Sequence, residues 1–206
     1  ACCGPDAPSG AQNLGQPIIV DNRSGAGGTI GTGQVARAEP GGHTLLANSS
    51  SHTVNPAIYP DLTYNTREDL RAVTLLAQQP NILVAAPSKG FKTVADLIAA
   101  AKARPGAMNF ASAGIGSVSH LAAERFRLSA GIEAQHIPFR GPNEAFTELM
   151  AGRIDFYFLP LAPALPLVKE GQLVALAVST DTRAAALPDV PTTMELGLKD
   201  SAYLFW

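Results

Sequence analysis

The sequence predicts an α/β protein with mostly parallel sheets flanked by helices. Three observations carry this prediction. Short apolar runs recur along almost the whole of the 206 residues. Helical patterns with recognisable start and stop residues separate most of these runs. No repeat period interrupts the alternation. Apolar strands connected through helices are typical of parallel sheets, because a parallel pair needs a long crossover connection.

Eight apolar runs are predicted to be strands. Most are followed by a helical pattern, but the third and fourth meet at "QPN" with no helix between them, which predicts that the chain crosses there from one sheet to another. In order, the predicted strands are 17–20, 43–48, 72–78, 81–87, 108–113, 133–139, 154–159 and 173–179.

The predicted helices of the later part of the chain have defined ends. Serine or threonine before a helix can accept a hydrogen bond from its first turn, proline is favoured at its first position, and glycine commonly ends it. Thr93 precedes 94–103, which Pro105-Gly106 stops. Ser117 precedes 118–130 and Pro142 precedes 143–151, and Gly131 and Gly152 follow these two helices.

Composition excludes several functional classes. A net charge of −2 offers no basic surface for nucleic acid, and no run of 18 apolar residues could cross a bilayer. Residues 1–13 are polar and glycine-rich, lack the apolar segment of a signal peptide, and are predicted to be an unassigned, disordered tail, so that the sequence could be a mature or trimmed form. Cys2 and Cys3 are adjacent, a spacing that suits neither a disulfide nor a zinc site.

The glycine-rich stretch "SGAGGTIGTG" raises the question of a nucleotide site. A phosphate-binding loop needs lysine after its last glycine, but Gln34 follows Gly33. The spacing G-x-G-x-x-A is present at 31–36, yet no carboxylate follows about 20 residues later to hold a ribose. The stretch is therefore interpreted as a turn that packs a helix closely, and no cofactor is predicted.

The loops after the predicted strands favour binding over catalysis. Serine, glycine, alanine and proline dominate 48–55, 111–120, 138–141 and 159–163, and Arg140 is their only ionic residue. Such loops can hydrogen-bond a small polar solute, but they offer little for acid–base chemistry. A small hydrolase or transferase that uses Ser117 is the alternative from another class, although the glycine required after the serine of a nucleophile elbow is missing. His120 and His136 are interpreted as packed, structural residues.

Six stretches in succession resemble one family. They are "NRSGAGGTIGT", "GGHTLLANSSSHTVNPAIY", "PNILVAAPS", "MNFASAGIGSVSHLAAERF", "HIPFRGPNEAFTELMAGRIDF" and "GQLVALAVSTDTRAAALPDVPTTMELGL". Together they are similar to substrate-binding proteins of tripartite tricarboxylate transporters, the Bug-type solute receptors, over Leu14 to Trp206.

The resemblance implies a type II periplasmic-binding-protein fold with two α/β lobes. It implies no enzyme activity, but a periplasmic receptor that binds a small organic acid (a di- or tricarboxylate, an amino acid or an aromatic acid) and delivers it to the permease subunits of a membrane transporter. The first lobe would comprise 14–78 and 202–206, and the second 79–201.

The resemblance also implies a ligand site shared by the lobes. The family's first-lobe loop matches Ser49 and Ser50, and its second-lobe loop at a helix N-terminus matches 112–117, where the helix dipole and free N–H groups would suit a carboxylate. The expected ligand-binding residues are Ser49, Ser50, Ser112, Ala113, Gly114, Gly116, Ser117, Phe139, Arg140 and Leu159; Leu159 stands where the family often has a polar side chain. No metal site is implied.

The sequence departs from the family at both ends. The opening strand and its "PPGG" loop have no counterpart in residues 1–13, and the chain stops at "AYLFW", where the family returns to the first lobe. The first lobe is therefore expected to be incomplete, so that a non-binding fragment of the receptor family is a further alternative, and weak binding with self-association is expected.

Overall fold

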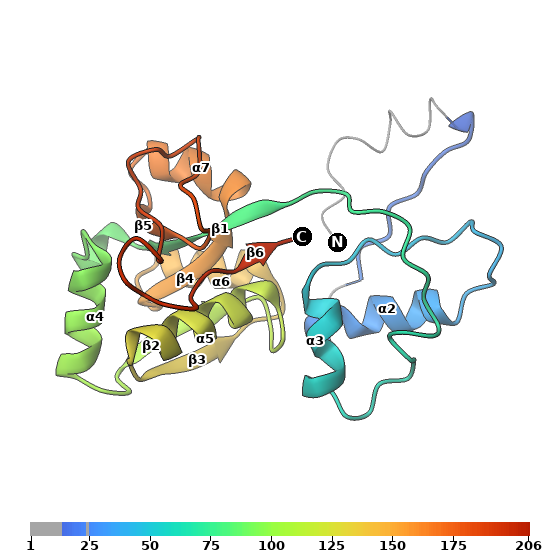
Figure 1. Cartoon of the computed structure of the whole chain (residues 1–206), viewed down its shortest axis with the longest axis horizontal. Coiled ribbons are helices and arrows are strands. Elements are labelled where there is room, and N and C mark those ends of the chain that lie inside the picture. Colours follow the sequence, from blue (N-terminus) through green and yellow to red (C-terminus); the bar gives the residue numbers. More distant parts are fainter. Residues whose placement is uncertain (1–13, 24) are drawn as a thin grey trace. The chain divides into compact units, whose positions relative to one another are not determined.

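The computed structural model describes residues 14–23 and 25–206, so the predicted tail with Cys2 and Cys3 lies outside the described residues. The chain divides into two compact units, Ala1–Ala72 and Val73–Trp206 (Figure 1).

The first unit contains short helices joined by long irregular segments. They are the 3-10 turn η1 (Ala26–Gly28) and the helices α2 (Thr29–Ala36) and α3 (Ser51–Ile58). The glycine-rich stretch forms the entry to α2, as predicted, and Gly28 adopts a left-handed conformation with φ 91° immediately before it. The side chain of Asn55 on α3 donates to the carbonyl of Gly27 at 3.3 Å, which ties the turn to that helix.

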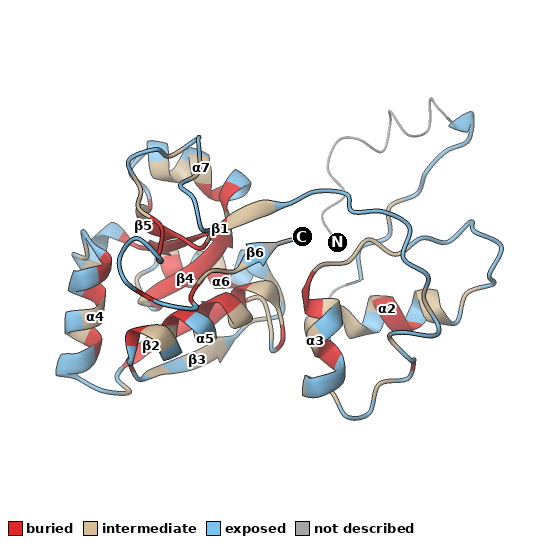
Figure 2. Ribbon diagram, viewed as in Figure 1, coloured by how far each residue is buried: buried red, intermediate tan, exposed pale blue. Residues whose placement is uncertain are grey.

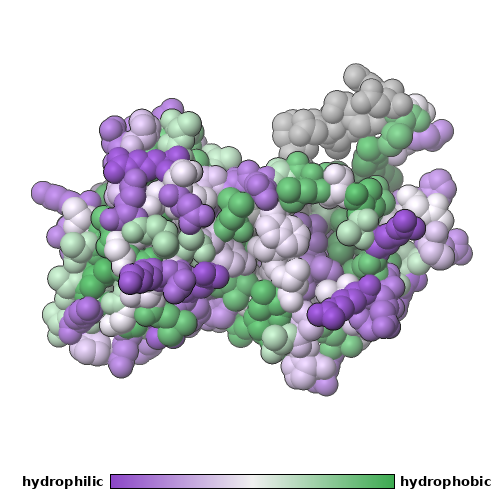
Figure 3. All heavy atoms as spheres, in the orientation of Figure 1, coloured by the Kyte–Doolittle hydropathy of each residue, from purple (hydrophilic) through white to green (hydrophobic). Residues whose placement is uncertain are grey.

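Three predicted strands are not formed. Residues 17–20, 43–48 and 72–78 are irregular, and none of them pairs with another segment in the described part of the chain. A strand is stabilised by hydrogen bonds to a neighbour, so an apolar run without one leaves its side chains in water. Ile19 is 88% exposed and Leu45 is 74% exposed. Figure 3 shows hydrophobic residues open on the visible face of the molecule.

The second unit is built on one sheet, and the five predicted strands after residue 78 are confirmed. Its strand order is β3-β2-β4-β1-β5, with the short β6 paired to the start of β1. Figure 1 shows these strands together in the part of the chain that also carries α4, α5, α6 and α7. The strands are β1 (Gln79–Ala85), β2 (Met108–Ser112), β3 (Ala134–Pro138), β4 (Phe156–Pro160), β5 (Val174–Val178) and β6 (Leu204–Phe205).

Strand direction in this sheet is mixed. β2 pairs in parallel with both β3 and β4, whereas β1 is antiparallel to β4 and to β5. Four of the five central strands therefore run the same way, and β1 alone is reversed. The prediction of a mostly parallel sheet holds for these four strands, and β1 is the exception.

Helices cover both faces of the sheet. One apolar cluster joins alternate residues of the strands to α4 (Val94–Ala103) and α5 (Val118–Ala130). The other cluster, on the opposite face, includes residues of α6 (Pro142–Met150) and α7 (Leu161–Lys169). A 3-10 turn, η2 (Pro87–Lys89), follows β1. Figure 2 shows the buried residues concentrated along the strands and the inner sides of these helices. This arrangement is a three-layer α/β/α unit.

The predicted helix ends are confirmed by geometry. Thr93 accepts from the N–H of Asp96 while the Asp96 carboxylate accepts from the N–H of Thr93, which is a complete capping box. Gly131 ends α5 in a left-handed conformation with φ 60°. These signals are local in sequence, which is why they could be predicted.

The unit boundary differs from the predicted lobe boundary. The division falls after Ala72 rather than after residue 78, and 202–206 belong to the second unit. The reason is that Leu204 and Phe205 pair with Pro80 and Gln79 of β1. How the segments divide between two lobes in a longer receptor stays a prediction.

Candidate functional site

One edge of the sheet in the second unit gathers most of the predicted ligand-binding residues. β2, β3, β4 and β5 run the same way, so their carboxyl ends meet at this edge, which is where open α/β sheets bind ligands. The loops after β2 and β3 are joined there, because the N–H of Phe139 donates to the carbonyl of Ser112 at 3.0 Å.

The loop 113–117 turns the chain from β2 into α5. Gly114 has φ 127° and Gly116 has φ 75°, conformations that favour glycine, and the Ser117 side chain caps α5 by accepting from the N–H of His120. The structure therefore places a glycine loop at the N-terminus of a 13-residue helix.

The N–H groups of this loop were expected to be free, and that expectation is wrong for this structure. The N–H of Ala113 donates to Ser119 Oγ at 3.0 Å and that of Gly114 to Ser112 Oγ at 3.1 Å. The N–H of Gly116 donates to His120 Nδ1 at 3.1 Å. Buried N–H groups rarely go without an acceptor, and here side chains supply it.

Burial separates the loop into two groups of residues. Ser112 and Gly116 are buried and support the loop from inside. Ala113, Gly114 and Ser117 are partly exposed, so they form the side that a solute can approach.

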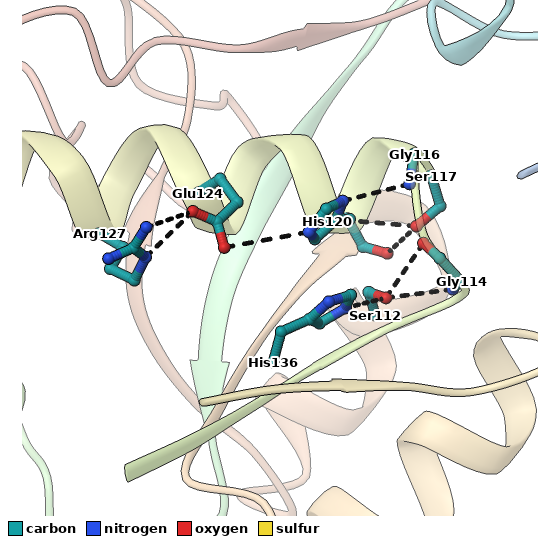
Figure 4. A network of polar contacts seen from close by, with 9 residues as sticks. Ser112, Gly114, Gly116, Ser117, His120, Glu124, Arg127 and His136 are labelled. Carbon is teal, nitrogen blue, oxygen red and sulfur yellow. Dashed lines mark hydrogen bonds and ion pairs between the residues drawn. The ribbon is translucent and has the colours of Figure 1, made fainter. Parts of the chain in front are cut away.

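Two histidines lie directly beneath the loop, as Figure 4 shows. His120 and His136 stack with ring centroids 4.1 Å apart and an interplanar angle of 16°. His136 Nε2 lies 2.6 Å from Ser112 Oγ. Sequence reasoning treated both histidines as packed residues without this role. The signal for His120 was its position four residues after Gly116, whereas the His136 contact depends on pairing between β2 and β3 and had no local signal.

The environment of the pair favours neutral imidazoles. Burial lowers the pKa of His120, and the nearby Glu124 carboxylate opposes this. Burial and, to a smaller degree, the proximity of His120 lower the pKa of His136 to about 4, with Glu124 again opposing. Burial also raises the pKa of Tyr157 to about 12, against a hydrogen bond with Ser119. All three groups are therefore uncharged at neutral pH.

The remaining predicted residues of the second unit lie around this loop in different settings. The carbonyl oxygen of Phe139 lies close to Gly114. A Cβ atom added at Gly114 would be 3.5 Å from this oxygen. Arg140 is exposed, and its backbone N–H donates to Glu144 Oε2 at 3.1 Å. Leu159 is only 5% exposed and packs in the apolar cluster that includes residues of α6 and α7, so its side chain is not open to a solute in this structure.

Ser49 and Ser50 lie in the first unit at the start of α3. Ser49 Oγ lies 2.8 Å from Ser51 Oγ, and the N–H of Ser49 donates to Asn48 Oδ1 at 2.7 Å. Ser50 is the residue before α3 and is buried. These serines form a hydroxyl-rich helix start within their own unit.

Asn81 is a polar residue of the sheet edge that sequence reasoning missed. It lies in the first half of the reversed strand β1, opposite Pro160, and is fully buried. Neither its side-chain nitrogen nor its side-chain oxygen has a hydrogen-bond partner among the described residues. A buried amide with no partner is costly, so this position is unusual for a strand.

The geometry does not assemble a nucleophile at Ser117. Its hydroxyl contacts Ser119 Oγ at 3.1 Å and the backbone N–H of His120 at 3.4 Å rather than an imidazole nitrogen. Ser112 does contact an imidazole, but it is fully buried and its hydroxyl also bonds to the carbonyl of Gly114. Within 14–23 and 25–206 no three acidic, histidine or cysteine side chains are grouped to hold a metal ion. None of the described helices is long and apolar enough to cross a membrane.

Comparison with known proteins identifies the group to which this chain is related. Residues 7–206 match the family described as tripartite tricarboxylate transporter family receptor. Protein BugT of Bordetella pertussis is 37% identical over 196 residues, which are 94% of this chain and 60% of BugT. A protein encoded in the tcbD–tcbE intergenic region of Pseudomonas sp. strain P51 is 36% identical over 95% of this chain and 59% of its own length. The chain thus spans about 60% of the length of these relatives.

Solved structures agree with this relationship. MatC from Rhodopseudomonas palustris, solved with bound malate, superposes with a TM-score of 0.90 at 31% identity and covers 100% of this chain and 73% of its own. Rpa4515 from R. palustris, solved with adipate, gives a TM-score of 0.92 at 30% identity over 97% of this chain and 67% of its own. With the family match over nearly the whole sequence, the chain belongs to the tripartite tricarboxylate transporter receptor family.

Proposed function

We propose that this chain binds a small organic carboxylate as the receptor of a tripartite tricarboxylate transporter. Its relatives are periplasmic solute receptors, not enzymes, and as a member of their family it is a periplasmic protein. The permease subunits of such a transporter are its proposed membrane partners.

The observation that carries the proposal is the loop 113–117. It stands at the carboxyl edge of four strands that run the same way and at the N-terminus of α5, where the helix dipole favours an anion. The N–H groups of Ala113 and Gly114 are held by serine hydroxyls, which a carboxylate can replace as the stronger acceptor. Ser117 adds a partly exposed hydroxyl on the same side.

The ligand class is proposed from the same chemistry. Two solved relatives carry malate and adipate, which are both dicarboxylates. One carboxylate would take the loop, and Arg140 is an exposed cation in the adjoining loop that can attract the second. Ser49 and Ser50 are the proposed contacts from the first unit, as the family resemblance implies.

A matched pair of cap variants tests this proposal. Ser117→Ala removes a proposed ligand contact together with the cap of α5, whereas Thr93→Ala removes only the cap of α4. Both variants should lose about 1 kcal/mol of stability. Only Ser117→Ala should weaken malate or adipate binding, by about tenfold or more, the effect of one hydrogen bond to a charged group.

Calorimetric titration of the 206-residue chain and its two variants measures this difference. Equal affinity in Ser117→Ala and Thr93→Ala would remove the loop from the site. If no member of a panel of organic acids binds the unsubstituted chain, the proposed function itself fails for this chain, and the alternative of a non-binding fragment of the family holds.

A further inference from the structure

The two histidines beneath the loop contact it in different ways, His120 directly at Gly116 and His136 through the hydroxyl of Ser112. The N–H of Gly116 donates to His120 Nδ1 at 3.1 Å. On the other side, His136 Nε2 lies 2.6 Å from Ser112 Oγ, and that hydroxyl both accepts from the N–H of Gly114 and donates to its carbonyl. The left-handed conformations of the loop are therefore held by imidazoles (Figure 4).

These contacts define the protonation state of each ring. An imidazole nitrogen accepts a hydrogen bond only when it carries no proton, so His120 Nδ1 is unprotonated while it holds Gly116. A hydroxyl has one proton, and Ser112 uses it toward the carbonyl of Gly114, so His136 Nε2 is the donor in its contact with Ser112. The observed network thus requires an unprotonated Nδ1 on His120, whereas His136 keeps its donor toward Ser112 in either protonation state.

Protonation would break this network in two ways. A protonated His120 has no acceptor left and turns an N–H toward the N–H of Gly116. Charge on both rings would also place two cations with centroids 4.1 Å apart. Phe110 stacks on His136 at 5.0 Å and offers no compensating charge.

The charged surroundings of the pair are limited. Glu124 Oε1 lies 3.9 Å from His120 Nε2, and the same carboxylate is paired with Arg127 at 2.7 Å. Tyr157, which bonds to Ser119, is kept protonated by its burial. Since Arg127 already engages Glu124, the carboxylate only partly offsets the burial that keeps both rings neutral.

We propose that His120 and His136 are positioning residues that hold the ligand loop in its binding conformation and that the loop is held only while His120 is uncharged, so that acidification releases the ligand. This inference rests on the proposed function, because it assumes that the solute binds at 113–117. The sign is fixed by burial, which lowers the pKa of His120: the loop is held above the ordinary histidine pKa of 6.5 and is lost as the pH falls below it through the lowered pKa of His120.

Conservative variants separate positioning from general packing. His120→Asn places an amide oxygen near the position of Nδ1, so it keeps an acceptor for Gly116 but cannot be protonated. His136→Gln keeps a donor for Ser112 in the same way. His120→Phe keeps an aromatic ring but offers no acceptor. His43 is exposed in the first unit, so His43→Asn is the matched control.

The first experiment needs no ligand. The backbone amide resonances of Gly114 and Gly116 are followed by NMR in the 206-residue chain between pH 7.5 and pH 4. In the unsubstituted chain and in His43→Asn they should shift together with the imidazole titration. In His120→Asn the acid transition at Gly116 should disappear, and in His120→Phe the Gly116 resonance should already be displaced at pH 7.5. An unchanged acid transition in His120→Asn would overturn the inference.

The second experiment measures malate affinity by calorimetry at pH 7.5 and pH 5. Malate itself takes up protons in this range, but equally for every variant, so the comparison between variants is unaffected. The unsubstituted chain should lose about tenfold more affinity than His120→Asn, which corresponds to one pKa unit of linkage. His136→Gln should lie between them. Identical losses would overturn the inference. If malate fails to bind at any pH, the proposed function fails, and the NMR experiment still decides whether the histidines hold the loop.

Discussion

Gly114 and Gly141 stand in two loops at the same edge of the sheet, but only Gly114 has a conformation that requires glycine. Gly114 has φ 127°, whereas Gly141 is extended with φ −177°. Space is not the obstacle at Gly114, because the nearest atom to an added Cβ is the Phe139 carbonyl oxygen at 3.5 Å. The difference between the two positions is therefore one of backbone conformation alone.

Alanine substitution at these two glycines should separate their roles. Gly114→Ala should lower the free energy of unfolding by about 1–3 kcal/mol, the usual cost of a residue held in a sparsely populated backbone region. Gly141→Ala should change it by less than about 0.5 kcal/mol, because its backbone is extended and no atom lies within 4 Å of an added Cβ. Urea denaturation of both variants measures the difference, and equal losses would show that the Gly114 conformation is not maintained in solution.

At the scale of single residues, sequence predicted the position of the loop better than its contacts. Ser117 was predicted as a helix cap because its signal lies within the next turn, and the structure confirms it. The expectation that the loop N–H groups are free was wrong, because the side chains of Ser119 and His120 in the first turn of α5 accept hydrogen bonds from them. The contact between Ser112 and His136 spans 24 residues and exists only because β2 and β3 pair.

At the scale of elements, the same distinction between local and distant signals decided which strands were predicted correctly. The runs that became β1 to β5 find neighbours within the second unit, whereas 17–20 and 43–48 have equally apolar sequences but no neighbour among the described residues. An apolar run indicates that a segment can form a strand, but it does not indicate whether a neighbouring strand is available to pair with it. The sequence likewise did not predict the reversed direction of β1, although it shows no helical pattern directly before this strand.

β1 also carries the fully buried Asn81, whose side-chain amide has no partner among the described residues. Asn81→Leu replaces the amide by an apolar group of similar size, so the free energy of unfolding should rise by about 1–3 kcal/mol, the penalty of an unsatisfied buried polar group. Asn143→Leu, at an exposed position of α6, is the control and should stay within about 0.5 kcal/mol. Thermal unfolding of both variants tests this, and a loss of stability in Asn81→Leu would mean that the amide is hydrogen-bonded in solution.

At the scale of the whole molecule, the apolar core is distributed very unequally between the two units. Both buried clusters are drawn from residues after position 81, and Tyr64 is the only buried hydrophobic residue of the described first unit. The exposed apolar side chains follow the opposite pattern: Ile19, Leu45 and Leu76 are each at least 74% exposed and lie before β1. Stability should therefore reside in the sheet and helices from β1 onward, and the tendency to self-associate in the residues that precede β1.

This distribution predicts how the chain behaves when it is divided. A segment 77–206 keeps every strand and both clusters but leaves out the exposed side chains before position 77. It should unfold in one cooperative transition, and its melting temperature should equal that of the full chain within a few degrees, because 14–72 contribute almost no buried apolar surface. In sedimentation experiments it should remain monomeric at concentrations where the 206-residue chain associates. Calorimetry gives the melting temperatures. A segment that fails to melt cooperatively, or that associates as strongly as the full chain, would contradict the prediction that the second unit is stable without the first.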